Sequence, residues 1–311
     1  MYAMKNGFKI KWIGLVLAFF FSLFTVFASF GIGNMTQANS IAESMAGLWG
    51  TPHWLTGAVI ALLALSILIG GIKSIGRVCG FFVPKMAVFY FVMGIAVIYM
   101  NRANLGQGIA MIFKMGLSPR AVAGGVGGTI VSGLFSSMRW GIARGIFSNE
   151  AGLGSAPIVA AAAKTDHPSR QGYINMTGTF FDTLVVCSVT GLIVASSGVL
   201  GSVDSHGKLI TGAALTMKAF EKALGPAGEI CVGLGIVMFA FSTIIGWEYY
   251  GEKALEYLVK KTSYIKLYRV VYSFVIFVGA TVPLQLVWNF SDTMNGLMAV
   301  QIGRASCRER V

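Results

Sequence analysis

The segment from Arg144 to Pro157 sets polar, charged and glycine residues into an otherwise apolar part of the chain. In hydrocarbon an unsatisfied backbone group is costly, so a helix breaks at membrane depth only where protein or a water-filled cavity takes up the freed groups. Such a break offers N–H groups to a carboxylate and C=O groups to an ammonium. We therefore interpret Phe147, Ser148 and Asn149 as residues that line a binding cavity.

Three charged residues in or beside apolar segments each allow two interpretations. Arg144 and Glu150 act in gating, or they form a structural ion pair at the cytoplasmic end of a helix. Asp182 is an intramembrane carboxylate, which costs at least about 2.5 kcal/mol at the bilayer centre if it stays unpaired. It belongs to an ion pathway or gate, or it bonds to neighbouring hydroxyls such as those of Thr179 and Thr183.

A second candidate site follows from Thr243 and Trp247, which are four residues apart and so share one face of a predicted helix. A hydroxyl with an aromatic wall one turn away suits a small zwitterion, and Ser242 adds an oxygen of the kind that sodium prefers. Alternatively, such hydroxyls bond to the carbonyl one turn back, and Trp anchors at a membrane interface. Gln37 and Asn34 face the same site or hydrogen-bond between helices.

The elements that would position these residues are membrane helices. The chain has 311 residues, of which 55% are hydrophobic and only 12% are charged. Its apolar stretches approach the roughly 20 residues that span a bilayer. This pattern predicts an all-α, polytopic membrane protein with about seven complete transmembrane helices and a truncated eighth. The predicted segments are 12–42, 55–72, 82–100, 123–147, 172–197, 228–251 and 270–288, with the eighth beginning near 290.

The net charge of +12 follows the membrane topology and does not indicate a nucleic-acid partner. Thirteen Lys and Arg fall in the segments 1–11, 70–85, 164–171 and 253–269, whereas six fall in 43–54, 101–120 and 198–227. Cytoplasmic loops of membrane proteins carry the excess of positive charge. This bias predicts a multi-pass protein of the cytoplasmic (inner) membrane with the N-terminus of the chain inside.

Residues 302–311 differ from the rest, because three Arg and one Glu follow directly on the start of an apolar helix. We interpret them as read-through of a sequencing adapter that is not native. Residues 1–301 then form a single, incomplete transmembrane domain. Cys79, Cys187 and Cys231 lie in or beside apolar segments without CxxC spacing, which predicts neither a disulfide framework nor a metal cluster.

Several motifs together resemble the sodium:alanine symporter family, also called alanine or glycine:cation symporters. The resemblance covers nearly all of residues 15–300, and the stretch 147–154 is highly specific to it. The motifs are Gly33-Asn34 with Gln37 and Asn39, 70–73, Val83-Pro84, 144–157, Gln171-Gly172, 181–183 with Cys187, 239–251 and 288–299.

This resemblance implies a leucine-transporter-like fold, in which two inverted five-helix repeats each begin with an unwound helix. By this likeness the chain starts at the third core helix and ends inside the tenth, so the first two core helices are absent. The implied substrate-binding residues are Gln37, Phe147, Ser148, Asn149, Thr243 and Trp247, and Ser242 or Thr243 contributes to a sodium site. A chain without the missing helices is expected not to transport alone.

The sequence therefore predicts sodium-coupled symport of alanine, glycine or a similar small neutral amino acid by alternating access in the lipid bilayer. The expected coupling ion is sodium, and no organic cofactor is expected. A proton-coupled carrier is the main alternative, and a channel is a weaker one. An intramembrane protease using Asp182 and Asp292 is disfavoured, since neither aspartate lies in a glycine-aspartate motif and no His-Glu-x-x-His or Gly-x-Ser-x-Gly occurs. We expect a transporter and not an enzyme.

Overall fold

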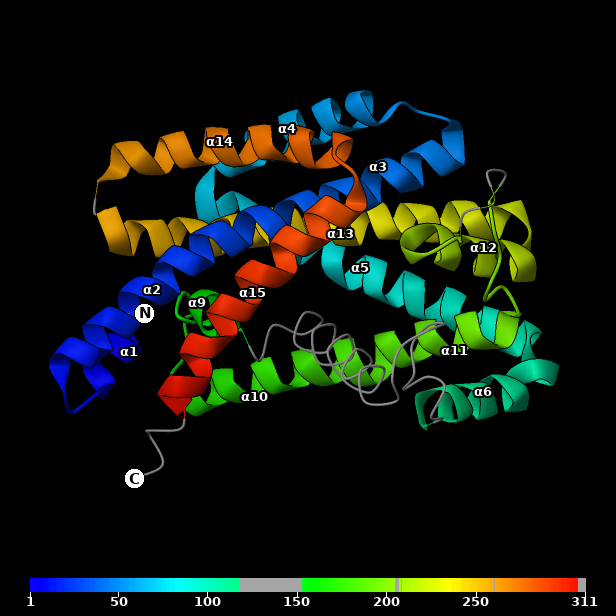
Figure 1. Cartoon of the computed structure of the whole chain (residues 1–311), viewed down its shortest axis with the longest axis horizontal. Coiled ribbons are helices and arrows are strands. Elements are labelled where there is room, and N and C mark those ends of the chain that lie inside the picture. The colour runs from blue at the N-terminus through cyan, green and yellow to red at the C-terminus, as the bar shows by residue number, and fades with distance from the viewer. Residues whose placement is uncertain (118–152, 205–206, 208, 260, 307–311) are drawn as a thin grey trace, which may run out of the picture. The chain divides into compact units, whose positions relative to one another are not determined.

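The computed structural model describes residues 1–117, 153–204, 207, 209–259 and 261–306, and these residues are predominantly helical (Figure 1). Within these ranges the extended pairing is an isolated antiparallel bridge between Val203 and Leu209, so the expected all-α class is confirmed. The helices are α1 (Tyr2–Gly7), α2 (Lys11–Phe30), η1 (Gly31–Met35), α3 (Thr36–Trp49), α4 (His53–Ile69), α5 (Gly71–Met100), η2 (Arg102–Asn104), α6 (Leu105–Leu117), α9 (Ala156–Ala160), α10 (Pro168–Thr179), η3 (Phe180–Cys187), α11 (Ser188–Ser197), α12 (Gly212–Leu224), α13 (Pro226–Val259), α14 (Thr262–Thr281) and α15 (Leu284–Ser306).

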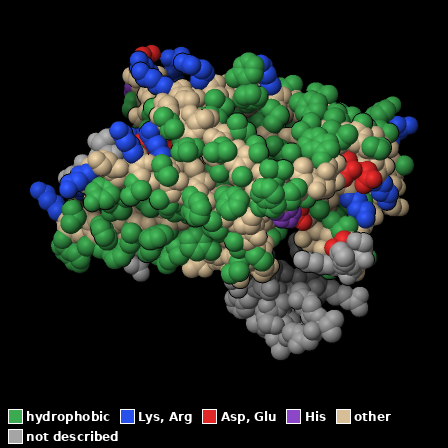
Figure 2. Space-filling view, turned by 90° about the horizontal axis from the view of Figure 1, so that it is seen from above, with side chains coloured by type: hydrophobic (Ala, Val, Ile, Leu, Met, Phe, Trp, Pro, Cys, Tyr) green, Lys and Arg blue, Asp and Glu red, His purple; other side chains and the backbone are tan. Residues whose placement is uncertain are grey.

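Five helical stretches in the described ranges are long and apolar enough to cross a membrane. They are Lys11–Trp49, Gly71–Met100, Pro168–Ser197, Pro226–Val259 and Ser263–Thr281, and the apolar α4 is shorter. Many large hydrophobic side chains on them face outward, such as Trp12 and Leu62, which are 67% and 68% exposed. Figure 2 shows hydrophobic side chains over much of the visible surface. This surface suits contact with lipid and supports a multi-pass membrane protein.

The C-terminal helices differ from the sequence expectation. The predicted segment 270–288 is wrong in its bounds, because α14 ends at Thr281 and α15 begins at Leu284 and not near 290. Pro283 explains the break, since proline lacks an N–H and disfavours helical geometry at the residue before it. Val282 is accordingly extended, with φ −85° and ψ 145°. The predicted segment 123–147 lies outside the described residues.

The chain divides into two compact units, and the first comprises residues 1–84, 150–175 and 236–311. In this unit α4 packs beside α14, and α15 packs beside α2. Its core is a cluster of buried hydrophobic residues from α3, α4, α5, α13 and α14. The members with at most 1% exposure are Ile41, Ala38, Ala42, Ala64, Leu68, Ile244, Ile245, Tyr272, Ile276 and Ala280.

At η1 the long helix from Lys11 to Trp49 widens into a π-helical turn. Its glycines allow close packing, as is common between membrane helices. A Cβ at Gly31 would lie 2.8 Å from Oγ of Ser291 on α15, and a Cβ at Gly33 would overlap the side chain of Trp247 on α13. Single π-turns inside α-helices are frequent at functional sites.

Two asparagine side chains join this segment to α14. Asn34 donates from Nδ2 to the carbonyl of Tyr272 at 2.8 Å. Asn39 donates to the carbonyl of Val282 at 2.9 Å and to that of Gly279 at 3.3 Å. These carbonyls at the C-terminal end of α14 thereby gain a hydrogen-bond donor. Of the two interpretations given for Asn34, interhelical hydrogen bonding is the one present here.

The second unit comprises residues 85–149 and 176–235. Here α11 packs against both α6 and α12. The hydroxyl of Tyr90 on α5 hydrogen-bonds to that of Thr190 on α11, and a Cβ at Gly94 would lie 2.7 Å from Val189. The segment η3, which precedes α11, is a second π-helical departure and runs over eight residues.

The contact between Gly33 and Trp247 generates a first prediction. Gly33→Ala should lower the stability of the protein by about 1–3 kcal/mol, because the new methyl group meets the base of a buried indole that has no room to shift. Thermal unfolding in detergent measures this effect. Gly246→Ala is the matched control, since Gly246 precedes Trp247 on α13 and no described atom lies within 4 Å of its added Cβ. Equal melting temperatures for the two variants would contradict the packing described.

Candidate functional site

The hydroxyls of Ser242 and Thr243 lie on α13 within the first unit and are both partly buried. Each donates to the carbonyl of Phe239, Ser242 at 2.8 Å and Thr243 at 3.0 Å. The local hydrogen bond considered for such residues is therefore present. It does not preclude cation binding, because a hydroxyl that donates its proton keeps two lone pairs on oxygen.

Trp247 is the largest fully buried side chain of the described core, at 2% exposure. Its ring makes an edge contact with Tyr250, with centroids 5.2 Å apart, and its base lies on Gly33. An indole in this position packs within the bundle, so the interpretation of Trp247 as an interfacial anchor is not supported.

Gln37 lies on α3, four residues after Gly33, and donates from Nε2 to the carbonyl of Ile32 at 3.2 Å. The segments that carry Gln37 and Thr243 meet where Gly33 lies on Trp247. The structure thus brings two of the predicted site segments together, and the hydrogen bonds of the Gln37 and Thr243 side chains each go to a carbonyl of their own segment. Gln37 is half-buried.

The remaining predicted residues are located differently. Arg144, Phe147, Ser148, Asn149 and Glu150 lie outside the described residues, so their predicted roles stay predictions. Asp182 is half-buried on the second unit and falls within η3, so this intramembrane carboxylate lies on π-helical backbone.

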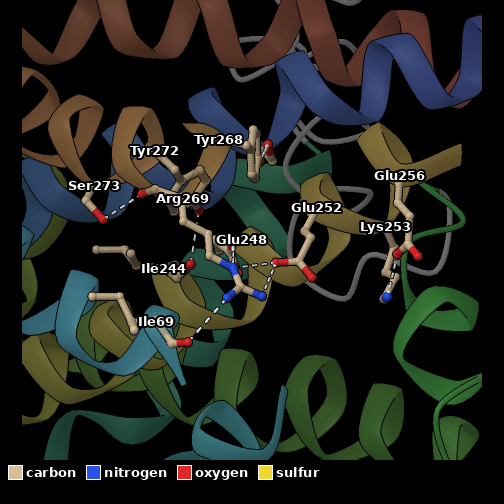
Figure 3. Close-up of polar contacts among 11 residues, drawn as sticks. Ile69, Ile244, Glu248, Glu252, Lys253, Glu256, Tyr268, Arg269, Tyr272 and Ser273 are labelled. Carbon is tan, nitrogen blue, oxygen red and sulfur yellow. Dashed lines mark hydrogen bonds and ion pairs between the residues drawn. The ribbon is translucent and has the colours of Figure 1, made fainter. Parts of the chain in front are cut away.

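A cluster that the sequence reasoning did not single out lies beside the first site (Figure 3). It consists of Glu248 and Glu252 on α13 and Arg269 on α14, whose side chains are 1%, 9% and 19% exposed. Arg269 holds Glu252 through Nε and Nη2, both 2.8 Å from the same carboxylate oxygen. Its Nε is 3.8 Å from Glu248, and its Nη1 donates to the carbonyl of Ile69 at 3.4 Å.

A signal for this cluster was present in the sequence. Glu248 falls inside the apolar segment predicted over 228–251, and an ionisable residue in a membrane helix is a functional hypothesis by default. Its cation, Arg269, is on the next helix and was counted as a cytoplasmic loop residue. The pairing of Arg269 with the glutamates of α13 could not be predicted, because it depends on how α13 and α14 pack.

The buried ion pair of Arg269 with Glu252 is expected to contribute strongly to the stability of the fold. Arg269→Gln should destabilise the protein by about 3–5 kcal/mol, because it leaves the buried Glu252 carboxylate without its cation. Lys253→Gln is the control, since the Lys253–Glu256 pair is 35% and 45% exposed and such pairs contribute little. Thermal unfolding in detergent should also show partial recovery in the Arg269→Gln, Glu252→Gln double variant. Equal losses for Arg269→Gln and Lys253→Gln would contradict the buried pairing.

Comparison with known proteins identifies the family to which this architecture belongs. The sodium:alanine symporter family matches residues 1–302. The chain is similar to the sodium/alanine symporter AgcS of Methanococcus maripaludis, with 46% identity over 96% of this chain and 64% of AgcS. It is also similar to the amino-acid carrier protein AlsT of Bacillus subtilis, with 34% identity over 96% of this chain and 60% of AlsT.

A further relative is the probable sodium/glutamine symporter GlnT of Bacillus subtilis, with 33% identity over 96% of this chain and 59% of GlnT. The chain therefore spans about three-fifths of the length of these relatives. The match nevertheless extends over almost the whole of the chain. The chain belongs to the sodium:alanine symporter family.

Proposed function

We propose that this chain is the larger part of a secondary transporter that couples entry of a small neutral amino acid to entry of sodium by alternating access. The observation that carries the proposal is the family match over residues 1–302. The substrate proposed is alanine, glycine or a similar amino acid, because the relative named for alanine is 46% identical and the relative named for glutamine is 33% identical.

The proposed substrate site combines Gln37, Thr243 and Trp247 with Phe147, Ser148 and Asn149. Support comes from the contact of Gly33 with Trp247, which sets the segment bearing Gln37 against the helix bearing Thr243. Ser242 and Thr243 are the proposed sodium ligands, since both hydroxyl oxygens retain lone pairs. Arg144, Glu150 and Asp182 are proposed to act in gating or as structural polar residues.

The proposed fold is leucine-transporter-like, with the first two core helices outside this chain. The share of the relatives' length that the chain spans is compatible with this proposal. Residues 302–311 are proposed not to be native, and the family match, which includes residue 302, leaves out 303–311. The distribution of Lys and Arg supports a cytoplasmic N-terminus in the cytoplasmic (inner) membrane.

A proton-coupled carrier is the second candidate, and one observation favours it. Glu248 is a buried carboxylate whose oxygens accept no hydrogen bond from any described residue. Proton relays in transporters use carboxylates of this kind. Replacement of sodium by potassium at constant pH separates the two couplings.

The Thr243 hydroxyl provides the test of the proposed site. Thr243→Ala should weaken sodium activation of alanine uptake about ten- to a hundredfold, because it removes an oxygen that binds a charged ligand. The assay uses proteoliposomes containing the gene product extended at both ends from its source DNA, with an inward gradient of sodium or of potassium.

Thr281→Ala is the matched control, because the Thr281 hydroxyl also bonds within one turn on its own helix, α14. This variant should keep the sodium dependence of the parent, and Thr243→Ser should restore it. Uptake that proceeds equally in potassium would exclude sodium coupling. Unchanged sodium activation in Thr243→Ala would remove Thr243 from the sodium site.

A further inference from the structure

We propose that Glu248 carries a proton in the folded protein, so that Glu248, Glu252 and Arg269 form a proton-binding site between α13 and α14. This inference deepens the proposed function by adding a second ion beside the proposed sodium site. The cluster holds two carboxylates and one guanidinium, all in the first unit. With both carboxylates ionised it would have an uncompensated negative charge inside the bundle.

The geometry assigns Arg269 to Glu252. Two nitrogens of the guanidinium lie 2.8 Å from Oε2 of Glu252, and the third donates to a backbone carbonyl. The approach of Nε to Glu248, at 3.8 Å, is too long for a hydrogen bond. Neither oxygen of Glu248 accepts a hydrogen bond from the described residues, although its side chain is 1% exposed.

The titratable groups of α14 that face Glu248, besides Arg269, are Tyr268 and Tyr272, and neither donates to it. Tyr272 donates its hydroxyl proton to the carbonyl of Ile244 at 3.0 Å. The Ser29 hydroxyl on α2 donates to the carbonyl of Val26 at 2.6 Å, so it accepts from Tyr268 at 2.7 Å. Both phenol hydroxyls therefore donate to groups other than Glu248.

The facing titratable group on α13 itself is Glu252, one turn after Glu248. Residues four apart share one face of a helix, so the two carboxyl groups are neighbours, but two ionised carboxylates have no proton to share. A proton on Glu248 supplies that donor and removes the excess charge. Two neighbouring carboxylates in a buried site ordinarily hold one proton in this way.

A proton fits this place better than a sodium ion. Hard cations bind to cages of several oxygens. One turn before Glu248 on α13 are Ile244 and Ile245, both fully buried, and the nearby Glu252 carboxylate is already bound to the Arg269 cation. Burying a carboxylate without compensation costs several kcal/mol, and protonation is the usual way in which a protein avoids this cost.

The site lies close to the proposed transport site along α13. Glu248 follows Trp247 directly and comes five residues after Thr243. Loss of the proton would place a second negative charge against the packed core between α13 and α14. The proton therefore links pH to the helix that bears the proposed sodium ligands.

Infrared spectroscopy of the lipid-reconstituted protein at neutral pH tests the proposal without any transport assay. The spectrum of the wild type minus that of Glu248→Gln should contain the C=O band of a protonated carboxylic acid, and the band should shift in D2O. The Glu256→Gln control should leave the band in place, because Glu256 is half-exposed and paired with Lys253. Absence of the band from the difference spectrum overturns the proposal.

Two further outcomes are decisive. Glu252→Gln should abolish the band, because Arg269 is then released to pair with an ionised Glu248. Glu248→Gln has the shape of the protonated acid, so it should be at least as stable as the wild type. The wild-type melting temperature should fall as pH rises, because Glu248 then loses its proton, and Glu248→Gln should lack this fall. A marked loss of stability in Glu248→Gln would contradict the proposal, since it would mean that the charge is required.

Sodium-independent uptake would refute the proposed symport and leave the infrared result unaffected.

Discussion

Polar groups inside a membrane bundle must find their partners within the protein, because hydrocarbon offers none. The arrangement of the first unit follows from this constraint. Asn39 supplies hydrogen bonds to carbonyls at the end of α14, where Pro283 stops the helix. Asn34 does the same for a carbonyl within α14 from the π-helical turn η1. The side-chain amides of Asn34 and Asn39, both on the helix from Lys11 to Trp49, thus join that helix to α14.

The same constraint explains the environment of the charged residues. Arg269 bonds to Glu252 and to a backbone carbonyl, which satisfies a guanidinium that is mostly buried. Glu248 is the exception among the acidic residues of this cluster, since its oxygens accept no hydrogen bond from the described chain. A buried polar network that is only partly satisfied is costly, and such exceptions gather where a protein binds ions or protons.

Much of the architecture could be predicted from the sequence, because long apolar stretches specify membrane helices by length alone. The helical class and the family both followed from such patterns and motifs. The π-helical turns could not be predicted, since the packing around η1 involves Ser291 and Trp247, which are distant in sequence. Pro283 indicates the break after α14, but the apolar residues on both sides of it favoured one continuous helix over 270–288.

The candidate site was predictable only in part. The spacing of Thr243 and Trp247 correctly placed both on one helix, yet the packing of Trp247 on Gly33 depends on two helices meeting. The predicted residues Phe147, Ser148 and Asn149 lie outside the described residues. For Glu248, the sequence revealed a carboxylate in an apolar segment, whereas its lack of a hydrogen bond depends on which partners Arg269, Tyr268 and Tyr272 already have.

The most direct test of sodium-coupled transport asks whether a gradient of alanine drives the movement of sodium. Proteoliposomes containing the extended gene product would have equal sodium on both sides and an inward gradient of alanine, with entry of radioactive sodium as the readout. Symport predicts that alanine drives net entry of sodium, because coupling between two transported ligands is reciprocal. Alanine entry that moves no sodium would contradict sodium coupling, and accompanying acidification of the lumen would identify the proton as the coupled ion.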